Sequence, residues 1–131
     1  MTFASVAERD AIEAEMPWEA RGVPTTLYGQ LEKTAKAHPD RPAVSYQLLS
    51  GPRDPAETLS WRELFERSTQ AANLFRSLGI GETDVVAYVL PNANETIHTL
   101  LGGAVAGIVN PINPLLETEQ NGAILRETGA K

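Results

Sequence analysis

The sequence contains no cysteine, and this absence alone excludes several kinds of protein. Without thiols there is no disulfide scaffold, no thiolate nucleophile, and no zinc finger or iron–sulfur cluster. Histidine is almost as scarce: the two histidines, His38 and His98, offer little to build a histidine-based metal site. We therefore expect no metal ligand in this chain.

Positive charge and long apolar runs are also scarce. The chain has 11 Lys and Arg against 17 Asp and Glu, so its net charge is −6 and we expect no nucleic-acid partner. The longest apolar run, Leu100–Val109, has roughly half of the ~20 residues that cross a bilayer, so no transmembrane segment is expected. Residues 1–10 lack the basic start and apolar stretch of a secretory signal, which predicts a cytoplasmic protein.

What remains is an ordinary globular composition. The 131 residues are 42% apolar and 21% charged, which is typical of a single folded domain with its own core. Residues 1–22 carry five acidic and two basic side chains, and we interpret them as a peripheral N-terminal arm with a short helix at 11–15 that Pro17 ends. Residues 23–131 form the second unit.

A helix and a β-hairpin are predicted at the start of this unit. Residues 42–47 are β-prone, residues 50–55 are rich in turn-forming Gly and Pro, and Thr58–Leu59 resumes a strand that pairs with the first. The preceding helix has an apolar stripe and a proline that stops it: Leu27, Leu31, Ala35 and then Pro39.

The next helix has the clearest start signal. Ser60 and Glu63 form a capping box, and Gly79 suits the left-handed residue that ends a helix. Its predicted buried face consists of Trp61, Leu64, Phe65, Ser68, Ala72, Phe75 and Leu78.

Two strands and two helices follow. The continuous apolar run Asp84–Leu90 predicts a strand covered on both faces, as in a parallel sheet. A helix capped by Asn92 and Glu95 then leads through Gly107 to a strand at 108–113. Its predicted buried stripe is Ile97, Leu100, Leu101, Ala104 and Val105.

The last predicted helix spans residues 118–128 and ends at Gly129, although Asn121-Gly122 weakens its middle. The alternation of strand and helix is typical of βαβ units, so the predicted fold class is α/β: partial parallel βαβ layers with a β-hairpin. The pattern expects one more strand at Gly129–Lys131, and the sequence therefore looks truncated.

The sequence lacks the common motifs for phosphate binding and for a nucleophilic serine. Neither a G-x-G-x-x-G nor a G-x-x-x-x-G-K-[ST] phosphate loop occurs, and G-x-S-x-G is absent. The remaining candidates for catalytic or ligand-binding residues are better explained by structural roles. We expect His98 to lie beside a buried stripe, His38 to lie at a helix end, and Glu63 and Glu95 to be capping partners. The aromatic candidates are expected in the core: Trp61, Phe75 and Tyr88. We predict no catalytic, cofactor-binding or metal-binding residue.

Four segments nevertheless resemble, in order and at the right spacing, the adenylate-forming enzymes: acyl-CoA synthetases, luciferases and peptide-synthetase adenylation domains. Thr58–Leu64 is similar to the first conserved motif, with Trp61 in place of the usual tyrosine. The others are Leu90-Pro91-Asn92 with Glu95, Ala106-Gly107 with Val109 and Asn113-Pro114, and Gly129-Ala130-Lys131. The resemblance covers about residues 25–131, with a longer turn at 48–57 and an unusual Asn121.

This resemblance implies the N-terminal subdomain of the adenylate-forming fold and, for the parent protein, an ATP-dependent acyl-CoA synthetase. Such an enzyme uses ATP and Mg to join a carboxylic acid to AMP and then passes the acyl group to coenzyme A. Asn113-Pro114 resembles the acyl-CoA synthetase branch more than the peptide-synthetase branch. The family's phosphate loop and catalytic lysine have no match here, so we expect an inactive fragment whose main partner is the remainder of the synthetase.

Two alternatives stay open at this stage: a complete, small, non-catalytic α/β module that binds a partner, and a naturally short regulatory paralogue. If strands 84–90 and 108–113 lack neighbours, their edges and apolar surface are exposed, and we expect self-association through them.

Overall fold

The computed structural model describes residues 5–49 and 51–131, which form five α-helices, one short 3-10 helix and four strands in that part of the chain. In chain order these are α1 (Val6–Glu15), η1 (Trp18–Arg21), α2 (Leu27–Ala37), β1 (Pro42–Gln47), β2 (Ala56–Ser60), α3 (Trp61–Ser77), β3 (Val85–Tyr88), α4 (Asn94–Ala106), β4 (Ile108–Pro111) and α5 (Thr118–Thr128).

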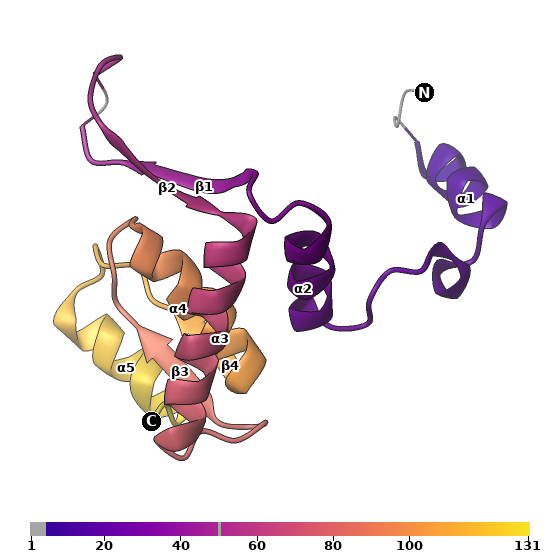
Figure 1. The fold of residues 1–131 in the computed structure, drawn as a ribbon. Helices are drawn as coiled ribbons and strands as arrows, with labels where there is room; N and C mark the ends of the chain where they lie inside the picture. The colour runs from indigo at the N-terminus through magenta and orange to yellow at the C-terminus, as the bar shows by residue number, and fades with distance from the viewer. Residues whose placement is uncertain (1–4, 50) are drawn as a thin grey trace.

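The helix α1 and the turn η1 stand away from the rest of the chain (Figure 1). The helix begins at Val6, well before the predicted 11–15, because the Ser5 side chain accepts a hydrogen bond from the Glu8 amide and caps it. At the other end Arg21 donates to the carbonyls of Ile12 (2.9 Å) and Met16 (3.1 Å). No residue of α1 is buried, so local capping rather than packing defines this helix.

The predicted hairpin is confirmed. Strands β1 and β2 pair antiparallel with Val44 opposite Leu59, and the register shifts between Pro42 and Val44. Leu59 points into the core and is 3% exposed. Ser50, the first residue of the predicted turn, lies outside the described residues.

The capping box of α3 is also confirmed. The Ser60 hydroxyl accepts a hydrogen bond from the Glu63 amide at 3.3 Å, and the Glu63 carboxylate accepts one from the Ser60 amide at 2.8 Å. Hydrogen bonds from the Ser60 amide and hydroxyl lower the pKa of Glu63 below its ordinary value. These bonds satisfy amides that the first helical turn leaves without intrahelical partners.

Replacing Ser60 with alanine is expected to lower the free energy of unfolding by about 1 kcal/mol at neutral pH, the usual effect of losing an N-cap. Because the pKa of Glu63 is lowered in the folded state, its contribution is present above the carboxyl's ordinary pKa of 4.5 and is lost as the pH falls through the lower folded value. Urea unfolding at several pH values should show the difference between the two proteins shrinking in acid. Ser77→Ala, near the exposed end of the same helix, is the control; a loss equal to that of Ser60→Ala would contradict the capping role.

The prediction that Leu78 belongs to the buried face of α3 is wrong. Leu64, Ser68 and Ala72 are buried as expected, but Leu78 is 70% exposed. The helix ends at Ser77 with Leu78 as its C-cap. Gly79 then takes a left-handed conformation with φ 87°, and the chain turns inward so that Ile80 is buried instead.

Strands β3 and β4 are parallel neighbours joined by α4, which confirms the predicted βαβ unit. The prediction that residues 84–90 form a strand covered on both faces is wrong. The strand ends at Tyr88, Val86 is its one buried residue, and Val89 and Leu90 are exposed. Val86 packs with Ile80 and Ala106, and Phe75 of α3 lies against this cluster.

The start and buried face of α4 also differ from the prediction. The helix begins at Asn94 after Ala93, which has no capping side chain, so the predicted capping box of Asn92 and Glu95 does not form. The five residues of the predicted stripe are half-buried, whereas the buried residues are Asn94, Gly102, Gly103 and Ala106. Gly102 lies against α3, where an added Cβ would meet Ala71 and Ala72, whereas Gly103 lies against the sheet, where it would meet Val109 and Val86.

The helix α5 matches the predicted span and ends at Gly129, which has a left-handed φ of 60°. A capping box of Glu117 and Gln120 offsets the weak Asn121-Gly122 pair. No residue of α5 is buried, yet its end is fixed: the Lys131 amide donates to the Val85 carbonyl at 3.0 Å. The chain therefore returns to β3 after α5.

Candidate functional site

The two histidines lie in different environments, neither of which forms a reactive pair. His98 is half-buried in α4, and this burial, with the positive charge of Arg67, lowers the pKa of its imidazole. A neutral imidazole is therefore favoured at pH 7. His38 is the exposed C-cap of α2, where its backbone amide donates to the Thr34 carbonyl at 2.9 Å. Its predicted place at a helix end is confirmed.

Among the other residues considered from the sequence, the structure supports a structural role for most. Phe75 packs on the core cluster, and Trp61 and Tyr88 are half-buried, with burial raising the pKa of the tyrosine. Glu63 is a capping residue, as predicted. Glu95 is an exposed first-turn residue of α4 that does not take part in a capping box.

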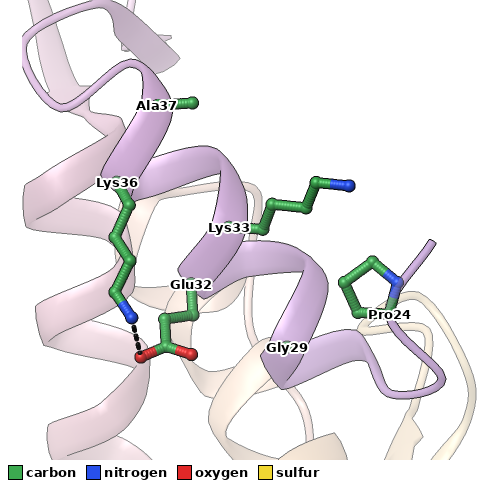
Figure 2. A pocket seen from close by; sticks show the side chains of 6 residues that line it. All are labelled: Pro24, Gly29, Glu32, Lys33, Lys36 and Ala37. Atoms are coloured by element: carbon green, nitrogen blue, oxygen red, sulfur yellow. Dashed lines mark hydrogen bonds and ion pairs between the residues drawn. The ribbon is translucent and has the colours of Figure 1, made fainter. Parts of the chain in front are cut away.

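A hollow of about 620 Å³ lies beside α2 and includes both lysines of that helix. Figure 2 shows Lys36 turned toward Glu32, with which it forms an ion pair at 2.7 Å, while Lys33 extends the other way. The Lys33 ammonium donates to the Gly22 carbonyl at 2.7 Å. Pro24, Gly29 and Ala37 complete the lining. Since both ammonium groups already have partners, this hollow is a poor anion site.

The carboxyl end of the β3–β4 sheet is the place where open α/β sheets usually bind ligands. Here the polar side chains of Asn94 and Asn113 form hydrogen bonds with backbone groups of the same chain. Asn94 is 2% exposed and donates from its amide to the Glu57 carbonyl of β2 at 3.3 Å, which joins α4 to the hairpin. The Asn113 side chain accepts a hydrogen bond from the Leu115 amide at 3.0 Å. Neither residue presents a reactive group.

The opposite end of β3 has an ion pair. Lys131 Nζ lies 2.8 Å from Asp84 Oδ1, and the other carboxylate oxygen of Asp84 accepts a hydrogen bond from the Gly81 amide at 2.8 Å. The Lys131 side chain is the main cause of a lowered pKa at Asp84, followed by the Gly81 amide. This pair links the end of the described chain to the start of β3.

Across residues 5–49 and 51–131, no group of three or more His, Asp or Glu side chains is placed to hold a metal ion. Within the same residues, no helix is long and apolar enough to span a membrane.

Sequence reasoning missed three features of this arrangement: the buried Asn94, the closely packed Gly102 and the pairing of Lys131 with Asp84. The burial of Asn94 was not predicted because a polar residue near the start of a helix usually acts as an exposed cap. Gly102-Gly103 in an apolar stripe was a usable signal of close helix packing. The pairing of Lys131 with Asp84 joins residues far apart in the chain, which no local pattern reports.

A family model described as "AMP-binding enzyme" matches residues 31–131. The marinolic acid–CoA ligase of Pseudoalteromonas sp. (strain SANK 73390) is 37% identical over 103 residues, a match covering 79% of this chain and 16% of the ligase. Surfactin synthase subunit 2 of Bacillus subtilis (strain 168) is 33% identical over 107 residues, covering 81% of this chain and 3% of that protein. The chain thus spans a small part of the relatives it matches.

Among solved structures, a fatty acyl CoA synthetase of Mycobacterium tuberculosis is similar, with a TM-score of 0.67 at 24% identity. The match covers 79% of this chain and 20% of the synthetase. The fold is thus found within a much larger protein.

Proposed function

Because this chain belongs to the AMP-binding enzyme family, with the fold of the N-terminal part of adenylate-forming enzymes, we propose that it is the N-terminal portion of an ATP-dependent acyl-CoA synthetase. The proposed overall reaction converts a carboxylic acid, ATP and coenzyme A into an acyl-CoA, AMP and pyrophosphate by way of an acyl-adenylate. The observation that carries this proposal is the family match over residues 31–131 together with a ligase relative at 37% identity.

The proposed role of these residues is structural. The histidines, the lysines of α2 and the carboxylates of the capping boxes are placed for packing, ion pairing and helix capping. Groups that bind ATP, Mg and coenzyme A would come from the remainder of the synthetase. Asn113-Pro114 supports the acyl-CoA synthetase branch over the peptide-synthetase branch, and a cytoplasmic location belongs to the same proposal.

The division at residue 22 is also proposed. The family match begins at residue 31, and α1 has no buried residue, so residues 1–22 are proposed as an arm outside the enzyme's folded core. Self-association is proposed through the surfaces of the segments 84–90 and 108–113, in which Val89, Leu90 and Ile108 are 46%, 36% and 51% exposed. Sedimentation at rising concentration should show dimers, whereas a monomer throughout would contradict this.

Acid-dependent exchange of pyrophosphate into ATP is the direct test of the proposed function. We expect no exchange by the 131-residue chain alone, and exchange by the polypeptide of the complete reading frame with at least one of a panel of aliphatic and aromatic acids. Coenzyme A should then be converted to a thioester by the same polypeptide. Exchange by the isolated chain, or none by the complete polypeptide with any acid of the panel, contradicts the proposal.

A further inference from the structure

The N-terminal arm has a fixed shape of its own. Helix α1 and the turn η1 lie apart from the other elements (Figure 1), and no residue of α1 is buried. The Arg21 guanidinium holds the two elements together, because it donates to the Ile12 carbonyl at 2.9 Å and to the Met16 carbonyl at 3.1 Å. A cation is favourable at this carboxyl end of the helix. The arm therefore keeps its shape without packing on the core.

Residues of both elements line a hollow of about 540 Å³. Ile12 and Met16 supply its apolar surface at the end of α1, and Met16 is 46% exposed. The other lining residues are charged: Glu13, Glu19 and Arg21. Because Arg21 is bonded to backbone carbonyls, the two glutamates decide the charge that the hollow presents to a partner. The hollow thus offers an apolar surface beside carboxylates.

The positive charges of the arm do not compensate these carboxylates. Arg9 contacts Asp10 and lies 3.9 Å from Glu13 Oε1, and such an exposed pair contributes little. In the described part of the chain, the Glu19 carboxylate has no hydrogen-bond or ion-pair partner. Residues 1–22 together carry five acidic and two basic side chains. A partner that fits the hollow therefore combines apolar with positively charged side chains.

An amphipathic helix with lysine or arginine beside its apolar stripe has this combination, because residues three and four positions apart lie side by side on a helix. We propose that the hollow of the arm binds a basic amphipathic helix of a partner protein. An apolar side chain of the partner packs on Ile12 and Met16, and a flanking cation pairs with Glu13 and Glu19. The apolar contact supplies most of the affinity, while the exposed carboxylates select a basic partner.

This inference adds a protein partner to the proposed synthetase. The residues that carry it precede residue 31, where the match to the family model begins.

Fluorescence anisotropy tests the apolar contact. The labelled peptide Ala-Lys-Leu-Ala-Lys-Lys-Leu-Ala-Lys-Leu-Ala-Lys is titrated with the 131-residue chain. We expect saturable binding, and none by the analogue in which glutamate replaces every lysine. Met16→Ser should weaken binding about tenfold, because serine does not pack on an apolar side chain of the peptide. Val6→Ser, at a position that is 65% exposed and does not line the hollow, is the control and should bind like the parent.

The same titration tests the carboxylates. Glu13→Gln and Glu19→Gln should each bind the peptide about threefold more weakly at low salt, and added salt should reduce the difference from the parent. Glu15→Gln is the matched control, since it removes an exposed negative charge of α1 that does not line the hollow. Glutamine and glutamate have nearly the same helix preference, so α1 is retained in these variants.

The proposal is overturned if the parent does not bind the basic peptide, if the glutamate analogue binds equally well, or if the two controls weaken binding as much as the lining variants do. Met16→Leu keeps an apolar side chain and should retain binding; a loss equal to that of Met16→Ser also overturns the proposal. So does a dimer, measured by sedimentation, that Met16→Ser abolishes, since the hollow would then receive a second copy. None of these measurements involves ATP or an acid, so failed peptide binding and failed pyrophosphate exchange are separate results.

Discussion

Gly102→Ala is expected to lower the free energy of unfolding by about 2 kcal/mol, although alanine is the better helix former by about 1 kcal/mol. A Cβ atom at this position would lie 2.5 Å from the Ala71 Cβ, 2.9 Å from the Ala72 amide nitrogen and 3.0 Å from the Ser68 carbonyl oxygen. Two of these atoms belong to the α3 backbone, so no rotamer change relieves the clash and the helices must separate. Urea unfolding measures the loss.

Gly122→Ala is the matched control, because it is also a glycine inside a helix. Its added Cβ would meet the end of the Arg126 side chain at 3.2 Å, which moves easily. We expect this variant to be more stable than the parent by up to about 1 kcal/mol, as helix preference dictates. If both substitutions stabilise the chain, the close approach of α3 and α4 at Gly102 is wrong.

Gly107→Ala is the second substitution for which we expect a large loss, about 2–3 kcal/mol. Gly107 follows α4 with an extended backbone, so conformational preference is not the reason. A Cβ there would lie 2.5 Å from the Asp84 carbonyl oxygen and 2.7 Å from that of Gly81, and the Asp84 carbonyl is the acceptor that starts the β3–β4 ladder. Making room for the methyl group must therefore move the start of β4 away from β3.

The control for this second prediction is Gly81→Ala, in the loop that Gly107 faces. Its nearest contact would be the Asp84 carboxylate at 3.4 Å, an ordinary van der Waals distance. We expect little change in the urea midpoint for this variant, together with intact amide protection in β4. In Gly107→Ala the amides of Ile108 and Ile112 should lose protection, and protection equal to that of the parent would show that the ladder start tolerates a methyl group there.

Most patterns that depend on residues close in the chain or on the order of neighbouring elements were predicted well, although the capping box of Asn92 and Glu95 was not. The structure has the capping box at Ser60, the ends of α2 and α5, the hairpin and the βαβ unit. Their signals are local hydrogen bonds and periodicity, which act within a few residues.

Predictions that depended on packing between elements were less accurate. Leu78 matches the helical stripe yet is exposed, since the chain turns inward at Gly79. The apolar stripe of α4 is half-buried, while Gly102 is buried against α3 and Gly103 against β3 and β4, because the neighbouring elements decide which face of the helix is covered. That the chain has no catalytic, cofactor-binding or metal-binding residue stays a prediction, because local patterns can assign Glu63 to a helix cap but cannot report which side chains meet a ligand.

The hydrogen bond from Asn94 to the Glu57 carbonyl has a consequence for how the molecule moves. The β1–β2 and β3–β4 pairs share no ladder in the described part of the chain, and this amide joins the hairpin to the helix that connects β3 and β4. A displacement of the hairpin would therefore be transmitted to α4 at its first turn, where the helix has no other side-chain cap. The buried amide group of Asn94 thus adds a direct hydrogen bond between the hairpin and α4 to the connection that runs through α3.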